Sequence, residues 1–351
     1  MRSLQLVEFG APLEWREQPT PEPAGGEVLL ETMATGVCHS DLHLWDGYYG
    51  DGAVRTYVKD RGVRLPITLG HEIVGRVVAA GPDAEGVAVG DVRLVYPWIG
   101  CGACRHCVDE RSNHCSAMRS LGVLTHGGYA DHVLVPDARC LLDIGTMRPE
   151  EAASYACAGL TAYAALRKLP PLEADEELVI VGAGGVGLMA AQVVRPMTQA
   201  RVTFVDLDGR KLEAARTFGD FDTIDGSAVD PREALMRRTD GRGVAAVVDF
   251  VGSSQTAALG QAVLAKNGTL VIVGLFGGEM TVPTHFFPLR NATIRGSYTG
   301  SLRELRELLA LVRERGVRPV PVACHALEEV PRILEEMRQG RVVGRAVVVP
   351  R

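Results

Sequence analysis

Residues 178–187 read Leu178-Val179-Ile180-Val181-Gly182-Ala183-Gly184-Gly185-Val186-Gly187, an apolar run that leads into a glycine-rich turn. The apolar run predicts a buried β-strand, and residues 186–194 can form the helix that follows it. Gly182, Gly184 and Gly187 allow a tight turn, bring the backbone close to a pyrophosphate and let the helix pack closely on the strand. The helix N-terminus presents unpaired amides to the phosphate charge. The segment therefore predicts a dinucleotide-binding site, and the alternative is a tight turn that binds no ligand.

An acidic residue follows where such a site needs one. Asp206 ends the strand-like run that begins at Arg201, nineteen residues past Gly187. Its carboxylate can accept hydrogen bonds from both hydroxyls of the adenosine ribose, and it would repel a 2′-phosphate. NAD is therefore favoured, although the nearby Arg210 and Lys211 keep NADP as an alternative.

Strand-like and helical patterns alternate around this motif. Strand-like runs span residues 178–181, 201–206, 245–250 and 269–273, and helical patterns span residues 186–194 and 210–218. Alternating β and α elements predict a parallel, doubly wound sheet. Pro196 should end or kink the first helix, because proline lacks the amide donor and crowds the preceding turn.

The first 142 residues follow a different pattern. Short β-rich runs at residues 28–32, 73–79 and 129–135 alternate with glycine and proline clusters, which is typical of an irregular antiparallel β domain. Between Arg148 and Leu169, apolar residues at helical spacing indicate a helical segment that contains a domain boundary. After Tyr298 the pattern predicts helices near residues 302–315 and 328–338 and a last strand at 345–349.

Composition excludes several classes of protein. The chain has 351 residues, 46% of them hydrophobic and 23% charged, which is enough to build the cores of two or three globular domains. No apolar stretch approaches the ~18 residues of a membrane span, and the N-terminus has no signal-peptide pattern. The net charge of -6 gives no general attraction for nucleic acid or anionic lipid. We therefore expect a soluble, cytoplasmic protein with neither nucleic acid nor a membrane as its partner.

Four of the eight cysteines lie close together, in the pattern Cys101-x2-Cys104-x2-Cys107-x7-Cys115. Four thiolates at this spacing can surround one tetrahedral zinc ion. Because they would fill its coordination sphere, this metal should hold a loop together and take no part in a reaction. Four free thiols and a small iron–sulfur cluster are the alternatives.

Three further candidate ligands are scattered along the chain. Cys38, His71 and Cys157 would supply two thiolates and an imidazole, a set that leaves one position of a zinc ion open for catalysis. Spacing alone does not connect them. A buried cysteine is often only a small apolar residue, and a lone histidine is more often structural than a ligand.

Six motifs together resemble those of the zinc-containing alcohol dehydrogenases of the medium-chain dehydrogenase/reductase superfamily, in order and approximate distance, over nearly the whole chain. They are Gly36-Val37-Cys38-His39-Ser40-Asp41, Gly70-His71-Glu72, the four-cysteine segment, Gly127-Gly128-Tyr129-Ala130, Cys157-Ala158-Gly159-Leu160-Thr161 and Gly182 to Gly187. The resemblance implies an α/β fold in which a GroES-like β-barrel domain carries the zinc ions and a Rossmann domain with a doubly wound parallel sheet binds the dinucleotide. It places the catalytic GroES-like domain at residues 1–158, with 299–351 returning to it, and the Rossmann domain at 159–298.

The resemblance also implies two zinc ions per chain. The four-cysteine segment would hold the structural ion, and the ligands of the catalytic ion would be Cys38, His71 and Cys157. Glu72 would lie behind the catalytic metal, and Asp41 would fix the ring of the histidine ligand. Ser40 and His43 match the family's proton relay, and the alternative is that they are a turn hydroxyl and a surface imidazole.

The cofactor contacts that the resemblance implies come from several parts of the chain. They are His39 and Arg345 at the pyrophosphate, Asp206 and Lys211 at the adenosine ribose, Gly182, Gly184, Gly185, Val186 and Gly187 in the turn, and Thr161, Val273, Leu275 and Tyr298 near the nicotinamide.

The activity implied is that of an NAD-dependent zinc alcohol dehydrogenase (EC 1.1.1.-). It would transfer a hydride between a primary or secondary alcohol, which could be bulky, cyclic or aromatic, and NAD, reversibly giving an aldehyde or ketone, and it would form a homodimer or homotetramer. A zinc-independent quinone or enone reductase of the same fold is one alternative, and a non-catalytic protein that binds dinucleotide and zinc is another.

The segment between Cys38 and His71 is longer than in simple bacterial members of the family, with the excess near residues 48–64. Its aromatic residues could line a pocket for a bulky, cyclic or aromatic alcohol, or they could be exposed loop residues. They are Trp45, Tyr48, Tyr49 and Tyr57. Its basic residues could meet an anionic substrate such as an acyl-CoA, or form a solvated face. They are Arg55, Lys59, Arg61 and Arg64.

Overall fold

In the computed structural model, which describes residues 1–51 and 54–350, a parallel six-stranded sheet forms the centre of one lobe. Its strands, in spatial order, are β13 (Asp222–Asp225), β12 (Arg201–Asp206), β11 (Glu177–Val181), β14 (Val244–Asp249), β15 (Leu264–Ile272) and β16 (Thr293–Gly296). This is the strand order of a doubly wound dinucleotide-binding sheet, with its centre at β11 and β14. Every residue of β11 is buried, as expected for a strand covered on both faces. The predicted parallel sheet is therefore confirmed.

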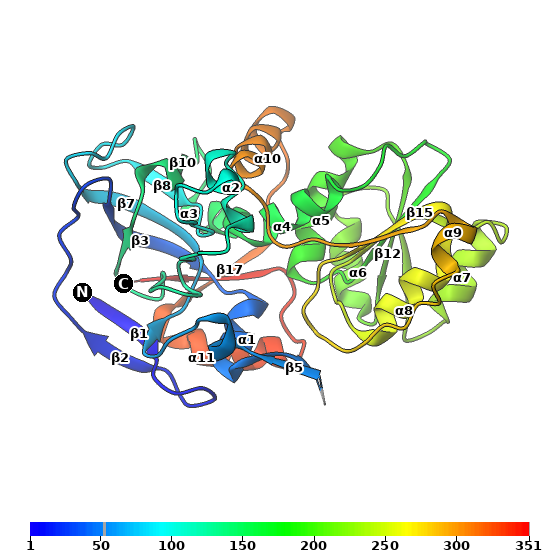
Figure 1. Ribbon diagram of the computed structural model, residues 1–351, viewed down its shortest axis with the longest axis horizontal. Coiled ribbons are helices and arrows are strands. Elements are labelled where there is room, and N and C mark those ends of the chain that lie inside the picture. Colours follow the sequence, from blue (N-terminus) through cyan, green and yellow to red (C-terminus); the bar gives the residue numbers. More distant parts are fainter. Residues whose placement is uncertain (52–53, 351) are drawn as a thin grey trace.

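Helices connect and cover these strands, and Figure 1 shows them around the sheet of the right-hand lobe. They are α5 (Gly185–Met197), α6 (Gly209–Arg216), α7 (Pro231–Arg238), α8 (Ser254–Val263) and α9 (Phe286–Arg290). Pro196 lies in the last turn of α5, which ends one residue later, in agreement with its predicted effect. The sequence patterns did not single out α7, α8, α9, β13 or β16.

The other lobe is mainly β-structure. Its largest sheet contains β10 (Leu141–Asp143), β8 (Val92–Val95), β7 (Glu72–Ala80), β3 (Val28–Gly36), β18 (Arg345–Val349) and β17 (Val322–Ala326), with β9 (His132–Val135) paired to β3. A three-stranded sheet joins β2 (Glu14–Glu17), β1 (Arg2–Leu6) and β6 (Ile67–Thr68), and β4 (Tyr48–Asp51) pairs with β5 (Val54–Tyr57). The pairing of β3 with β7 is antiparallel and brings Gly36 opposite Glu72.

Both ends of the chain contribute to this lobe, where Figure 1 places the N and C labels. Strand β18 pairs antiparallel with β3, with Val347 opposite Gly36, and β17 runs parallel to β18. The chain thus returns to its first lobe after crossing the parallel sheet. The exact domain limits, 1–158 with 299–351 and 159–298, stay a prediction.

Further helices lie between and beside the sheets. They are α1 (His39–Asp46), α2 (Arg105–Val108), α3 (Pro149–Ala152), α4 (Ala158–Leu166), α10 (Leu302–Arg315) and α11 (Val330–Arg338), with short 3-10 turns at Val58–Arg61, Ser112–His114, Ala138–Cys140, Ala153–Ala156 and Leu327–Glu329. All of α4 is buried between the lobes (Figure 1), where it packs on α5 and α10. Gly159 permits this approach, because a Cβ there would lie 2.8 Å from Met189 Cε.

The predicted helical segment between Arg148 and Leu169 is interrupted. Cys157 has φ -127° and ψ -71°, so the chain breaks its helix there and starts α4 at the next residue. The break turns the Cys157 side chain into the protein interior instead of leaving it within a continuous helical face. Among the described residues, no helix is both long and apolar enough to span a membrane.

Candidate functional site

Three donor side chains that lie far apart in the sequence meet in the β-rich lobe. Cys38 follows β3 and caps α1, His71 immediately precedes β7, and Cys157 caps α4. One donor atom from each lies within 4.8 Å of the others, and the two sulfurs are 4.0 Å apart. All three side chains are buried. The antiparallel pairing of β3 with β7 is what brings Cys38 and His71 together.

The chemistry of this cluster fits a zinc ion. The Nε2 atom of His71 is buried and has no hydrogen-bond partner among the residues that the structure describes, which is costly unless a ligand satisfies it. Two sulfurs bound to one tetrahedral zinc lie about 3.8 Å apart, close to the separation seen here. A hydrogen bond from Cys157, opposed by burial, holds the pKa of Cys38 well below its usual value. Three protein donors would leave one position open.

Two carboxylates surround the cluster. Asp41 is fully buried and its Oδ1 atom lies 3.1 Å from His71 Nδ1, so the metal-facing nitrogen is Nε2. Glu72 accepts a hydrogen bond of 3.1 Å from the Ala158 amide and forms an ion pair with Arg345. Burial, partly offset by Arg345, raises the pKa of Glu72 to about 7.

Arg345 connects this cluster to the glycine-rich turn. Its guanidinium is almost fully buried, pairs with Glu72 and donates from Nε to Ser154 Oγ at 3.0 Å. A Cβ on Gly185 would lie 2.5 Å from Arg345 Nη1. The residue predicted to contact the pyrophosphate therefore lies between Glu72 and the start of α5.

The glycine-rich turn has the geometry that its sequence predicts. Gly182 has φ +91°, and a Cβ on Gly187 would lie 1.9 Å from the Gly182 carbonyl oxygen. These two positions therefore exclude side chains. Asp206 accepts a hydrogen bond of 2.7 Å from the Ala183 amide, which fixes its carboxylate beside the turn. Val186 lies in the first turn of α5, and Lys211 lies in α6, the helix that follows Asp206.

The residues predicted to carry protons lie on α1. Ser40 and His43 are three positions apart, so they lie on one side of the helix. The His43 ring centroid is 5.1 Å from that of His39 and 5.3 Å from that of Tyr49. Burial, and then the neighbouring His39, lower the pKa of His43 to about 4. The imidazole of His43 is therefore neutral at pH 7 and a weaker base than an ordinary histidine.

The residues predicted near the nicotinamide come from three parts of the chain. Thr161 is in α4 and donates its amide to the Cys157 carbonyl at 2.8 Å, while Val273 and Leu275 follow β15. Tyr298 follows β16, and its ring centroid is 5.9 Å from that of Trp98. These residues belong to three separate segments; α4 begins directly after Cys157, and the segment of Tyr298 contacts Trp98.

Trp98 is a site residue that the sequence patterns did not identify. Its ring centroid is 5.6 Å from that of His71, and its Nε1 donates to the Ala156 carbonyl at 3.2 Å. The signal available in the sequence is a tryptophan just before the four-cysteine segment, which gives no indication of its neighbours.

The hairpin β4–β5 directs only one of its aromatic residues toward the site. Tyr49 lies beside His43, whereas Tyr48 stacks with Arg55 at 4.1 Å and Tyr57 is exposed near Lys59. The Trp45 indole donates to the Ala11 carbonyl at 2.6 Å, away from the cluster. Side-chain alternation along a strand accounts for the difference between Tyr48 and Tyr49.

The four cysteines form a second cluster. Their sulfurs lie within 4.8 Å of one another, with Cys101 4.0 Å and Cys104 3.5 Å from Cys107. These separations are too long for disulfides, which join sulfurs at about 2.05 Å. Hydrogen bonds from the Ala103 and Cys104 amides lower the pKa of Cys101 to about 6. Four convergent sulfurs, at least one poised to ionise, fit a zinc ion with no open position.

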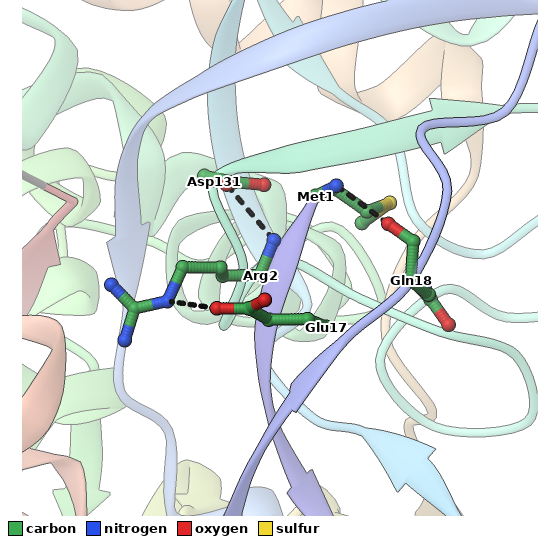
Figure 2. Close-up of a pocket in the computed structure, with 5 residues that line it drawn as sticks. All are labelled: Met1, Arg2, Glu17, Gln18 and Asp131. Atoms are coloured by element: carbon green, nitrogen blue, oxygen red, sulfur yellow. Dashed lines mark hydrogen bonds and ion pairs between the residues drawn. The ribbon is translucent and has the colours of Figure 1, made fainter.

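A surface hollow of about 490 Å³ lies elsewhere, beside β1 and β2 (Figure 2). Its lining residues are Met1, Arg2, Glu17, Gln18 and Asp131. Arg2 donates its amide to Asp131 at 2.9 Å and forms a 3.6 Å ion pair with Glu17, so its polar groups satisfy one another. None of these residues belongs to either sulfur cluster or to the glycine-rich turn.

Comparison with known proteins gives consistent matches over the whole chain. Residues 24–144 match the family model "Alcohol dehydrogenase GroES-like domain", and residues 185–314 match "Zinc-binding dehydrogenase". The chain is 37% identical to an NAD-dependent alcohol dehydrogenase of Sulfurisphaera tokodaii and 35% identical to one of Saccharolobus solfataricus, with 100% of each chain covered in both cases. The crystal structure of an alcohol dehydrogenase from Aeropyrum pernix superimposes with a TM-score of 0.90 at 33% identity, again covering both chains completely.

The lowered pKa of His43 predicts a specific dependence of stability on pH. The folded-state value of about 4 lies below the usual 6.5, so protons bind more tightly to the unfolded chain, and stability falls as the pH drops below 6.5. Between pH 7 and pH 5 this group should cost the wild type about 1–2 kcal/mol, a loss that His43→Gln should not suffer. Urea unfolding of the zinc-loaded protein at both pH values measures the difference.

A matched control is His285→Gln, because His285 is exposed. This variant should lose as much stability as the wild type between the two pH values. If His43→Gln behaves in the same way as the control, the imidazole of His43 is not held neutral by burial.

Proposed function

Because the chain belongs to the zinc-containing alcohol dehydrogenase family of the medium-chain dehydrogenase/reductase superfamily, we propose that it oxidises alcohols with NAD and, in reverse, reduces aldehydes or ketones. The observation that carries this proposal is the cluster of Cys38, His71 and Cys157, with the unpartnered Nε2 of His71 aimed into it. Arg345 links that cluster to the glycine-rich turn, which supports a metal and a dinucleotide sharing one site.

The two bound groups supply the reactive chemistry. A zinc ion held by Cys38, His71 and Cys157 would provide the Lewis acid that polarises the substrate oxygen. NAD held at the turn from Gly182 to Gly187 would provide the hydride acceptor. The four-cysteine cluster has no vacant ligand position, so a second zinc there would stabilise its loop only. Two zinc ions per chain are therefore proposed.

The protein's own residues position these groups and move the proton. Asp41 holds the His71 ring by its Nδ1 atom, which fixes the tautomer that exposes Nε2. Ser40 and His43 lie on one side of α1 and would carry away the proton that alcohol oxidation releases. The lowered pKa of His43 makes it a weak base, which favours rapid release of that proton to the next acceptor.

Aromatic side chains favour apolar substrates of some bulk. Trp98 and Tyr298 lie on one side of the cluster, and Tyr49 lies beside His43. Rings in these positions would exclude water and contact the carbon skeleton of an alcohol. We therefore propose aromatic, cyclic or other bulky alcohols as the better substrates.

Asp206 supports NAD over NADP. Its carboxylate is fixed beside the turn by the Ala183 amide, in a position to bind ribose hydroxyls and to repel a 2′-phosphate. Arg210 of α6 is paired with Asp208 at 2.8 Å, and this pair would compete with binding of a 2′-phosphate by Arg210. We propose His39, Lys211, Arg345, Thr161, Val273, Leu275 and Tyr298 as the remaining cofactor contacts.

Two alternatives are weaker. A zinc-independent quinone or enone reductase would not need the buried Nε2 of His71 and the two thiols beside it to converge. A binding protein without turnover would not require a three-donor metal cluster linked by Arg345 to the dinucleotide turn. Both alternatives are decided by the activity measurement below.

The assembly and compartment are also proposals. Strand β16 ends the parallel sheet with an exposed edge, near the exposed apolar residues Phe276 and Leu289. Pairing of two such edges would extend the sheet into a homodimer, which could assemble further into a tetramer. The free thiols of the four-cysteine cluster suit a reducing compartment such as the cytoplasm.

A panel of primary, secondary, cyclic and aromatic alcohols, assayed with NAD and with NADP, tests the proposed function. We expect NADH formation with alcohols, faster for aromatic and cyclic ones, and two zinc ions per chain by metal analysis. Removal of the accessible zinc by a chelator should abolish turnover, because the site then lacks the Lewis acid that polarises the substrate oxygen. Added Zn²⁺ should restore the activity. Absence of turnover in both directions, or turnover that survives zinc removal, contradicts the proposal.

Asp206→Ala should change the choice of cofactor. The variant loses the ribose hydrogen bonds and the repulsion of a 2′-phosphate, so kcat/KM with NAD should fall about 10- to 100-fold while that with NADP rises. Glu213→Ala is the control, because it removes an exposed carboxylate of the same helix, paired with Arg216 at 3.0 Å, and leaves the Arg210–Asp208 pair intact. An unchanged ratio of NAD to NADP activity in Asp206→Ala would remove Asp206 from cofactor selection.

His43→Gln should lower turnover about tenfold and alter its dependence on pH, since the variant cannot accept the proton. The KM for NAD should change little. Small imidazole-like bases added to the assay should restore part of the rate. A variant whose pH profile matches that of the wild type shows that His43 has no part in proton transfer.

A further inference from the structure

The carboxylate of Asp41 accepts four hydrogen bonds, which fill both of its oxygens. Oδ1 accepts from His71 Nδ1 at 3.1 Å and from the Gly70 amide at 3.2 Å. Oδ2 accepts from the Cys38 amide at 2.9 Å and from the Tyr129 hydroxyl at 2.9 Å. Three of these donors lie on Cys38, on His71 and on Gly70, the residue that precedes His71. The fourth, Tyr129, lies more than fifty residues from each of them in the sequence.

Tyr129 is held in place independently of its hydroxyl. Its amide donates to the Leu69 carbonyl at 3.0 Å, and its carbonyl accepts from the Leu4 amide at 2.8 Å. Its ring is completely buried and packs against Gly70, where a Cβ would lie 2.6 Å from Tyr129 Cδ1. Burial and the Asp41 charge raise the pKa of Tyr129 well above its usual value, so the phenol remains a proton donor.

We propose that Tyr129 is a positioning residue that tunes the catalytic metal through the chain Tyr129–Asp41–His71. This inference rests on the proposed function, because it assumes that His71 binds the metal through Nε2. The ring of Tyr129 would pack in the same way without its hydroxyl, so the hydroxyl has a separate role at Asp41.

The direction of the effect follows from competition for the Asp41 charge. A hydrogen bond from a buried phenol to a carboxylate draws electron density away from that carboxylate. Asp41 consequently pulls less strongly on the His71 Nδ1 proton, and His71 donates less charge through Nε2. The metal would then keep a stronger positive character. Without the hydroxyl, Asp41 would also lose the contact that fixes one side of Oδ2.

Tyr129→Phe removes only the hydroxyl and preserves the ring, so it tests the proposal directly. The single-turnover rate of NADH formation should fall about 3- to 10-fold. This loss is no larger than the smallest losses expected when a residue that directly contacts a metal ligand is replaced, because Tyr129 acts through Asp41. The KM for NAD should stay within about twofold, because the dinucleotide turn is unaffected. With Co²⁺ in place of zinc, the absorption bands of the Cys2His site should shift, while those of the four-thiolate site should not.

Tyr96→Phe is the matched control. Tyr96 is fully buried, and its hydroxyl donates to the Gly300 carbonyl at 3.0 Å without contacting Asp41. This variant should show the stability loss of a lost buried hydrogen bond but keep the wild-type cobalt bands of the Cys2His site and the wild-type single-turnover rate.

The outcomes separate this inference from the proposed function. A wild-type enzyme that neither binds zinc nor oxidises alcohols contradicts the proposed function itself. An active wild type together with a Tyr129→Phe variant whose cobalt spectrum and single-turnover rate are unchanged overturns the inference alone. Equal changes in the two phenylalanine variants also overturn it, because they would reflect core packing and not the hydrogen bond to Asp41.

Discussion

The pairing of β3 with β7 is the constraint on which the site depends. It sets Gly36 opposite Glu72, so the residues just beyond each strand, Cys38 and His71, meet in the interior. There is no room for a side chain at Gly36, where a Cβ would lie 2.0 Å from a Glu72 carboxylate oxygen. A shift of one residue in this register would turn His71 to the other face of the sheet and separate the donors.

The sequence predicts local clusters well and distant ones poorly. The four cysteines and the turn from Gly182 to Gly187 bring their functional groups together within a few residues, so spacing alone identifies their chemistry. Cys38 and Cys157 are 119 residues apart, and no periodicity connects them. Their grouping could be predicted only from the resemblance of surrounding motifs to a known family.

Side-chain direction is what sequence patterns leave undetermined. In the hairpin β4–β5, Tyr48 and Tyr49 are neighbours, yet only Tyr49 reaches the site. Trp98 and Tyr129 lie in segments whose patterns indicate strands and turns, and nothing in them reveals a contact with His71 or Asp41. Burial of an aromatic ring can be predicted from hydrophobicity, whereas the partner of its polar atom depends on the tertiary structure.

Arg345 shows why the two ends of the chain are needed for one site. A buried guanidinium is costly unless a carboxylate and further acceptors compensate it, and Glu72 and Ser154 meet this need. The same guanidinium fills the space over Gly185 at the start of α5. Because β18 holds Arg345 beside β3, the surroundings of Glu72 and the space over Gly185 depend on one strand near the C-terminal end. The cation thus connects the candidate metal site with the glycine-rich turn, and the negative charge of a pyrophosphate at the turn would compete with Glu72 for Arg345.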